Sequence, residues 1–549
     1  MILFYPDGRI ESINEKGKEI SMAKNVSGAL FLRPTSGLTK YFGTWTSLFA
    51  IVGASVGTWQ WLFVGTLQDM YPGINAGLTW GIGLSFMLIY SVMMTLLSMA
   101  MPRSAGLYQI SARGFNPVAG ILAVWRGIIA NPIIKTSEFY LFLVFLGAAF
   151  AHWGAVTKNA TMTSWGMSFS AQSPWVLVSV SIALMALFSF IAYLGPLFKV
   201  EPGVQMLGGL FSTIGWIMAI FVLLTTPAAT VPSRWDAVWG TGAYEEVQTV
   251  AAAAGYAAPA FNIQTTILAT VWPIGLVWPY LILLYGGEVS DPAKNLVITQ
   301  VGGGLILTVL LATAAALFQG VFGTFSSAYS VAAATGHLTR TGFFMGGLGT
   351  FTATLAANPV ISGWILLSPV VVGLTATPIN MAWVTRGFFQ ASLDRMMPSF
   401  FAKLSRFHTP TYSILYYLIF GAPFAFAYAA GYGGFLAVVT SLVGLWGIEM
   451  IFQSMAALQL PFLRRPLYEG SVRKQPEIGG LALVSILGII ILPTSLFVMI
   501  GFFQGAAFLS LISMCIQYGF SALWFVAFSQ HLRNKGIDVG GIYESLPPE

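Results

Sequence analysis

Gly53-Ala54-Ser55-Val56-Gly57-Thr58 lies in the middle of an apolar stretch, residues 44–68, that is long enough to cross a membrane. Its counterpart is Trp272-Pro273-Ile274-Gly275-Leu276-Val277-Trp278-Pro279, within the apolar stretch 266–286. Glycine permits unwinding at low steric cost, and proline removes an amide hydrogen bond and clashes with the preceding turn. Because polar backbone at membrane depth is tolerated only in a cavity or against protein, both stretches predict helices broken at a binding site. For the first stretch the alternative is a small-residue packing face, since Gly53 and Gly57 are four residues apart.

The composition agrees with a chain whose solvent is lipid. Of 549 residues, 56% are hydrophobic and only 8% are charged, whereas an ordinary soluble domain is about 25% charged. So few charges could not cover the surface of a soluble protein of this size. The net charge of +6 therefore indicates basic loops of a membrane protein, and we expect no nucleic-acid partner.

Twelve apolar stretches are long enough to be membrane spans. They are residues 44–68, 78–101, 117–150, 174–194, 203–226, 266–286, 299–325, 359–385, 410–430, 433–460, 478–500 and 506–530. The third is long and is either tilted or interrupted at Asn131-Pro132. The first and the sixth span, which carry the two broken stretches, are five spans apart, as expected for inverted repeats with a substrate site near the midplane.

The distribution of Lys and Arg predicts the orientation. With the N-terminus inside, 20 of the 25 Lys and Arg residues fall in inside segments, three in outside segments and two, Arg126 and Lys135, within the third span. Basic residues concentrate on the cytoplasmic side, so both termini are predicted to be cytoplasmic, in the cell membrane. The first 40 residues carry no apolar core behind a basic start, so we interpret them as a cytosolic tail and not a signal peptide.

The predicted organisation follows from these spans. It comprises a cytosolic tail (1–43), helices one to five (44–226), an extracellular segment (227–265), helices six to ten (266–460), a cytosolic loop (461–477), helices eleven and twelve (478–530) and a cytosolic tail (531–549). Residues 326–357 are too weakly apolar to span and are predicted to form helices on the outer mouth. Asn159-Ala160-Thr161 is an outside glycosylation sequon or an ordinary loop asparagine.

Motifs for catalysis, metals and cofactors are missing from the sequence. The single cysteine, Cys515, and four widely separated histidines offer no metal-ligand spacing. The sequence contains neither HExxH nor a GxxxxGK[ST] phosphate-binding loop, and none of the aspartates lies at a span centre. We therefore expect no enzyme activity, no cofactor and no resident metal. A channel would need a polar lining or a charged ring, which the spans do not offer.

Five motifs resemble those of the amino acid–polyamine–organocation permease family. In chain order they are Gly53-Ala54-Ser55-Val56-Gly57, Pro102-Arg103-Ser104-Ala105-Gly106-Leu107-Tyr108, Asn116-Pro117-Val118-Ala119-Gly120 with Trp125, Gly287-Glu288-Val289-Ser290-Asp291-Pro292-Ala293-Lys294-Asn295, and Thr385-Arg386 followed by Asp394-Arg395-Met396-Met397-Pro398 and Thr409-Pro410. They cover residues from about 50 to 420, in the family's order and spacing.

The resemblance implies an all-α membrane protein with two inverted five-helix repeats (the leucine-transporter-like fold) and two peripheral helices. It implies transport of amino acids or related amines by alternating access. The substrate carboxylate would meet free amides of helix one, and the amine would meet carbonyls of helices one and six, as helix-end dipoles favour. The candidate substrate-binding residues are Gly53, Ala54, Ser55, Val56, Gly57, Thr58, Trp59, Trp272, Ile274, Gly275 and Trp278.

The sequence departs from the family at two tryptophans. Trp59 stands where the family usually has a third glycine in helix one. Trp278 stands where helix six usually has a small residue, unless a short gap places Gly275 there. Indole faces attract ammonium groups, so the two side chains suit an aromatic or cationic ligand. The alternative is that both face neighbouring helices or lipid.

Few ionisable residues lie inside the predicted spans, and such residues are usually functional. Lys135 and Glu138 are three apart, so they share a helix face and can pair. Arg126 precedes Lys135 by nine residues and is predicted to lie on another face. Glu449 in the tenth span has no partner that sequence reveals, and a low dielectric favours the neutral form of a buried carboxyl.

The coupling candidates for protons are Glu449, Lys135 and Glu138. The resemblance adds a sodium site, because some relatives hold sodium with hydroxyls of helix eight, so Thr375 and Thr377 are the sodium candidates. Each candidate is set against a purely structural role. The predicted function is a proton-coupled transporter or an exchanger. The alternatives are a non-transporting membrane sensor on the same fold, or a sodium-coupled polyamine or organocation transporter. The substrate, the direction of transport and the oligomeric state are not readable from the sequence.

Overall fold

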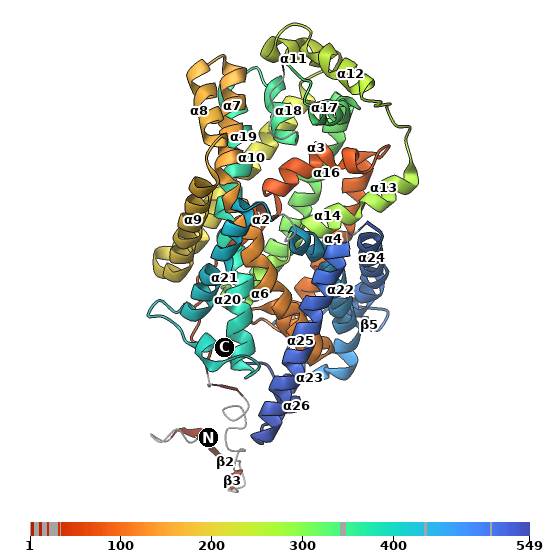
Figure 1. Cartoon of the computed structure of the whole chain (residues 1–549). Helices are drawn as coiled ribbons and strands as arrows, with labels where there is room; N and C mark the ends of the chain where they lie inside the picture. Colours follow the sequence, from red (N-terminus) through yellow and green to blue (C-terminus); the bar gives the residue numbers. More distant parts are fainter. Residues whose placement is uncertain are drawn as a thin grey trace.

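The computed structural model describes residues 2–4, 10–13, 19–20, 31–32, 35–340, 347–432, 436–505 and 508–548. Within them the fold is helical (Figure 1), and eleven helices are long and apolar enough to cross a membrane. The predicted class, an all-α multi-pass membrane protein, is thereby confirmed. The tail predicted at 1–43 lies largely outside the described residues, apart from β1 (Ile2–Phe4), β2 (Ile10–Ile13), β3 (Glu19–Ile20) and the approach to the first helix.

The elements of the first half match the first five predicted spans. They are α2 (Thr44–Ser55), α3 (Thr58–Met70), α4 (Ala76–Ala100), α5 (Gly106–Gln109), η1 (Ile110–Phe115), α6 (Pro117–Tyr140), α7 (Phe142–Thr157), α8 (Ala160–Ser170), α9 (Pro174–Leu194), η2 (Leu197–Lys199) and α10 (Val200–Leu224).

The remaining elements run to the C-terminal region. They are η3 (Ala228–Thr230), α11 (Val231–Trp239), α12 (Ala243–Ala253), α13 (Ile263–Ala269), α14 (Val271–Leu276), η4 (Leu281–Glu288), α15 (Pro292–Val297), η5 (Ile298–Gly302), α16 (Gly303–Phe322), α17 (Phe325–Ala334), α18 (Leu348–Leu355), α19 (Pro359–Thr375), α20 (Thr377–Leu393), η6 (Ser399–Ala402), α21 (Thr411–Ala429), α22 (Leu436–Leu463), α23 (Arg465–Glu469), β4 (Glu477–Ile478), β5 (Leu481–Ala482), α24 (Leu483–Gly505), α25 (Phe508–Asn534) and α26 (Val539–Glu544).

Both predicted helix breaks are present. The first span stops being helical at Val56 and Gly57, between α2 and α3. In the sixth span, helix α14 continues through Pro273, and the break follows at Val277, where the backbone becomes extended. Pro279 then precedes the 3₁₀ segment η4. The break therefore lies at the C-terminal end of the predicted stretch, because Pro273 is within the first turn of α14, where its missing amide costs little.

The interruption predicted at Asn131-Pro132 is wrong. Helix α6 continues through both residues, and the discontinuity comes at Leu141, before α7. The Asn131 amide group donates to the Gly127 carbonyl at 3.1 Å, one turn earlier on the same helix. Helices α6 and α7 together cover 41 residues, or about 60 Å if straight, so they extend well beyond a bilayer core of about 30 Å.

Short helices cover one end of the bundle. Helices α11, α12, α17 and α18 gather there, at the top of Figure 1, while α26 lies at the opposite end. The helices predicted within 326–357 correspond to α17 and α18, with 341–346 outside the described residues. Asn159 of the sequon caps α8, and its side chain accepts a hydrogen bond from the Met162 amide at 3.0 Å.

The count of twelve spans stays a prediction. Helix α22 has the place and length of the predicted span 433–460, but it is not among the eleven helices that meet the length and hydropathy criteria within the described residues. Its described part carries Glu449, Gln453 and Ser454, all fully buried.

Close packing between α2 and α10 holds the first helix break in place. A Cβ added at Gly53 would lie 2.5 Å from the Gly209 Cα, so the two helices approach to backbone contact. Beyond the break, the freed Val56 carbonyl accepts from the Ser212 hydroxyl at 3.1 Å and from the Trp216 indole at 3.4 Å. The small-residue packing face and the helix break are thus both present. The close contact between α2 and α10 places the donors of α10 next to the freed carbonyl.

We predict that Gly209→Ala destabilises the protein whereas Gly203→Ala on the same helix does not. The new Cβ at 209 would overlap the Phe49 carbonyl, but at 203 nothing lies within 4 Å. Overpacking costs about 1–3 kcal/mol, while an unopposed Gly→Ala change gains up to about 1 kcal/mol of helix propensity. Thermal unfolding of both variants in detergent measures the difference. Equal unfolding temperatures would contradict the close helix contact.

Candidate functional site

A cavity of about 310 Å³ lies between the two helix breaks, at the lower end of the range of about 300–1,000 Å³ typical of ligand pockets. Helices α2, α3, α6, α14, α19, α20 and α22 contribute to its walls. The lining residues are Ala54, Gly57, Thr58, Trp59, Gln60, Phe63, Arg126, Asn131, Ile134, Lys135, Glu138, Trp272, Gly275, Leu276, Trp278, Val372, Gly373, Ala376, Asn380, Trp383 and Trp446.

Seven of the eleven candidate substrate-binding residues line this cavity. They are Ala54, Gly57, Thr58, Trp59, Trp272, Gly275 and Trp278. The other four support it from behind. Gly53 packs on α10, the Ser55 hydroxyl accepts from the Trp278 amide at 3.2 Å, the Val56 carbonyl is bonded to α10, and Ile274 is fully buried.

The break in the first span presents the start of a helix to the cavity. Gly57 is the N-cap of α3, and Thr58 and Trp59 follow it. The first amides of a helix have no intrahelical partner, and the helix dipole adds partial positive charge there. This point of the cavity therefore favours an anion or a hydrogen-bond acceptor.

The carbonyls at the sixth-span break already have protein partners. The Gly275 carbonyl accepts from the Trp278 indole at 2.9 Å, and the Leu276 carbonyl accepts from the Gln60 amide group. The family resemblance implies that a substrate amine would meet such carbonyls. Here the Trp278 indole and the Gln60 amide group already donate to them, so this wall is less suited to an ammonium group.

Lys135 and Glu138 pair as predicted. The Lys135 ammonium donates to Glu138, whose carboxylate also accepts from the Trp59 indole at 2.9 Å. The Lys135 side chain is 4% exposed and that of Glu138 is 11% exposed. Since both line the cavity, this ion pair is one of its two charged features.

Arg126 and Glu449 form the second ion pair at the cavity, and the sequence did not reveal this pairing. The Arg126 Nε donates to Glu449, and both side chains are buried. Arg126 lines the same cavity as Lys135, although nine residues separate them on α6. The sequence predicts different helix faces for these two residues, and both side chains nevertheless border one cavity. Only the tertiary structure supplies the partner of Glu449, 323 residues away in sequence.

Aromatic rings form much of the wall. The Arg126 guanidinium lies 4.3 Å from the Trp383 ring centroid and 5.5 Å from that of Trp446. Phe63 stacks on Trp272 with centroids 4.9 Å apart. Trp59 and Trp278 therefore belong to a larger aromatic lining of the cavity.

The two sodium candidates do not line the cavity. The Thr375 hydroxyl donates to the Val371 carbonyl at 2.9 Å, and the Thr377 hydroxyl donates to Gly373 at 3.5 Å. Both bonds stay within their own segment of the chain, as is usual for hydroxyls in membrane helices. Among the described residues, no group of three His, Cys, Asp or Glu side chains could hold a metal ion.

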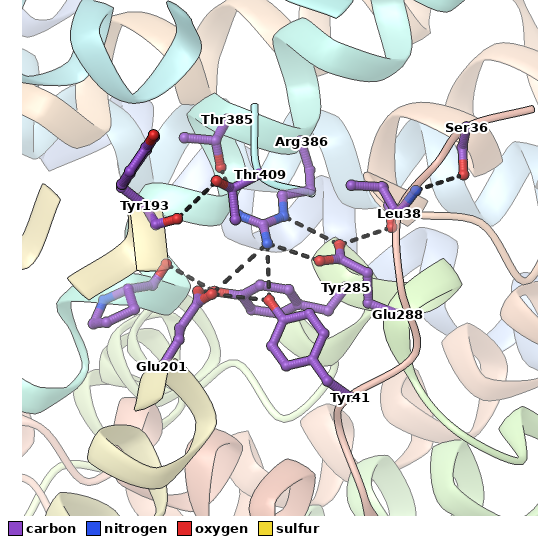
Figure 2. A network of polar contacts seen from close by, with 12 residues as sticks. Ser36, Leu38, Tyr41, Tyr193, Glu201, Tyr285, Glu288, Thr385, Arg386 and Thr409 are labelled. Atoms are coloured by element: carbon purple, nitrogen blue, oxygen red, sulfur yellow. Dashed lines mark hydrogen bonds and ion pairs between the residues drawn. The ribbon is translucent and has the colours of Figure 1, made fainter. Parts of the chain in front are cut away.

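A buried network of polar contacts surrounds Arg386 of α20, three residues beyond Trp383 (Figure 2). Arg386 donates to both Glu288 oxygens, at 2.7 and 3.1 Å, and to the Tyr41 hydroxyl at 3.0 Å. Tyr41 in turn donates to Glu201 at 2.8 Å, and Tyr285 donates to the same carboxylate. The Arg386 network thus joins the segment before α2, the start of α10, η4 and α20.

A second buried pair lies near the C-terminal region. Arg113 of η1 donates to both Asp394 oxygens, at 3.0 and 2.9 Å, and to the Ser545 carbonyl at 2.7 Å. The Tyr108 hydroxyl donates to Asp394 at 2.6 Å. Burial and the Asp394 carboxylate raise the pKa of Tyr108, so this hydroxyl stays protonated. The family-like motifs contain Tyr108, Glu288, Arg386 and Asp394, so the motif residues meet in these two networks.

Comparison with known proteins adds no assignment. No protein-family model matches the chain, and no curated protein shows significant sequence similarity to it.

We predict that Lys135→Met and Glu138→Leu each destabilise the protein and that the double variant recovers most of the loss. Each single change leaves one buried charge without its partner, at a cost on the order of 3 kcal/mol, while replacing both is often neutral. Thermal unfolding of the three variants measures this. Trp59→Phe is the matched control, since it removes one donor to Glu138 and should cost about 1 kcal/mol. A double variant as unstable as the singles would contradict a paired role.

Proposed function

We propose that this protein is a secondary active transporter of amino acids or related amines, working by alternating access and coupled to protons or acting as an exchanger. The observation that carries the proposal is the cavity enclosed by two broken helices, lined by helix-end backbone and buried charges. Irregular backbone at membrane depth is typical of transporter binding sites. The family-like motifs of the sequence support the same function, and nothing in the cavity resembles an enzyme's nucleophile and base.

The arrangement of helices favours two inverted repeats of five, followed by two peripheral helices. In this proposal the repeats are α2–α10 and α13–α22, with α22 as the tenth span. Helices α24 and α25 pack on α22 from outside the repeats. The broken helices then have equivalent positions in the two repeats, the first span of each.

The Arg386 network supports alternating access. It joins the segment before the first span to the fifth, sixth and eighth spans. Opening the cavity toward this network requires these buried groups to separate and find water. Charges that are buried in one state and hydrated in the other give two discrete states, which is the requirement for a two-state gate.

We predict that Glu449→Gln abolishes accumulation driven by a pH gradient but leaves substrate exchange largely intact. Glutamine keeps the size and hydrogen bonding of the side chain but carries no proton. Uptake into proteoliposomes of an amino-acid and amine panel, with imposed proton or sodium gradients, measures both activities.

Each outcome of the uptake experiment has a meaning. Accumulation by Glu449→Gln on a pH gradient would exclude Glu449 as the coupling group. Accumulation by the wild type only with sodium would reject proton coupling and favour the alternative of a sodium-coupled polyamine or organocation transporter. Thr375 and Thr377 would then be the residues to test. Binding without any uptake would identify a sensor instead of a transporter.

The proposed orientation places both termini in the cytoplasm. In a Cys515→Ser background, Thr241→Cys should react with an impermeant thiol reagent added outside intact cells, and Val472→Cys should not. Both positions are exposed, so only the membrane separates them from the reagent. Permeabilised cells, in which both should react, are the control. The reversed labelling pattern would reject the orientation.

A further inference from the structure

Arg126 has hydrogen-bonding capacity that the protein does not use. Its Nε donates to one oxygen of Glu449, while its Nη2 is buried and has no partner among the described residues. The second oxygen of Glu449 is likewise buried without a partner. The Arg126 side chain is 6% exposed and lines the cavity. A buried, unpaired guanidinium nitrogen beside a cavity is costly unless a ligand accepts from it.

The chemistry of a guanidinium selects the group that it binds. Its planar set of donors matches a carboxylate, which accepts two parallel hydrogen bonds. Trp383 and Trp446 hold the guanidinium plane by cation–π contact and limit its orientation. Arg126 is therefore restrained before a ligand arrives, which lowers the entropy lost on binding.

The rest of the wall suits a flat apolar body better than an amine. Trp59, Trp272 and Trp278 border the cavity, and stacking on an indole favours aromatic ligands. The carbonyls of Gly275 and Leu276 already accept from protein side chains. A substrate amine is therefore tolerated in this cavity but not required.

We propose that Arg126 binds the carboxylate of a substrate with a flat, apolar body, and that this carboxylate replaces Glu449 as the partner of Arg126. The inference rests on the proposed function only in taking this cavity as the substrate site. Glu449, once separated from Arg126, takes a proton from solution and becomes neutral. One substrate anion and one proton then enter together, so the net charge of the buried site does not change.

Among the residues that the structure describes, no second carboxylate or imidazole acts electrostatically on Glu449. The charge of Arg126 of α6 acts on Glu449. The charge of Glu449 in turn acts on three tyrosines: Tyr90 of α4, Tyr280 at the sixth-span break and Tyr518 of α25. The Tyr90 hydroxyl donates to Gln453, and the Tyr518 hydroxyl donates to the Leu445 carbonyl at 3.2 Å. Glu449 is therefore the group that exchanges the proton.

The test uses two matched sets of three ligands on the purified full-length protein. Each set contains an aromatic amino acid, its deaminated acid and its decarboxylated amine: L-phenylalanine, 3-phenylpropionate and phenethylamine, then L-tryptophan, 3-indolepropionate and tryptamine. Binding is measured by calorimetry and by the shift in unfolding temperature. We expect the amino acids and the acids to bind at least about tenfold more tightly than the amines, since the amines lack the charge-assisted bonds to Arg126.

Two variants separate the role of Arg126 in ligand binding from its role in folding. Arg126→Gln combined with Glu449→Gln leaves two neutral amides that can bond to each other, and it should fold but lose at least about tenfold in affinity for the acids. Glu449→Gln alone removes the competing carboxylate, and it should bind the acids as tightly as the wild type or more tightly.

The pH dependence supplies an independent readout. Between pH 6 and 8 both acids remain ionised, so any change in their binding reports on the protein. Binding to the wild type should tighten as pH falls, by up to about tenfold per pH unit for one linked proton, and Glu449→Gln should lose this dependence. The same pH dependence in both proteins would overturn the exchange of partners.

Three results would overturn the assignment of Arg126. They are amines that bind as tightly as the acids, a double variant that keeps its affinity for the acids, and a wild type that binds none of the four carboxylates. Binding of the acids without uptake into proteoliposomes would instead reject transport while leaving the assignment of Arg126 in place.

Discussion

A backbone carbonyl freed at membrane depth must find a hydrogen bond, and the structure around the cavity follows from how this is done. The Val56 carbonyl bonds to Ser212 and Trp216 of α10, and the Leu276 carbonyl bonds to Gln60 of α3. The second of these bonds joins the two broken helices directly. Because the breaks are satisfied by side chains from neighbouring helices, they keep their shape without a ligand, and the space between them remains a cavity.

Buried charged side chains, like freed backbone carbonyls, must also find partners within the protein. Arg126 with Glu449, Lys135 with Glu138, and Arg113 with Asp394 each combine one basic and one acidic side chain. Arg386 pairs with Glu288 and has Glu201 3.8 Å away, and two tyrosine hydroxyls donate to Glu201. A buried pair adds little to stability on its own, yet removing one partner is costly. Such pairs therefore fix which helices meet, and three of the four join elements that are far apart in the sequence.

The sequence predicted those features that depend on local chemistry. Gly57 and Pro279 marked the breaks because their effect on a helix is local, whereas Pro273 lies within α14. Lys135 with Glu138 was readable because three residues place two side chains on one helix face. The Arg126 partner was not readable, since it depends on how α22 packs against α6. Asn131-Pro132 misled because a proline can kink a helix without ending it, and α6 continues through Pro132 to Tyr140.

Helix α20 connects the cavity to the Arg386 network. Trp383 and Arg386 are three residues apart on it, so one side of the helix carries both the indole that contacts Arg126 and the guanidinium that binds Glu288. The contact with α6 is close, because a Cβ at Gly127 would overlap the Trp383 ring. A packed interface of this kind has discrete arrangements and does not deform continuously. Any movement of Arg126 that displaces Trp383 must therefore be transmitted to Arg386, so the state of the cavity and the state of the network are physically linked.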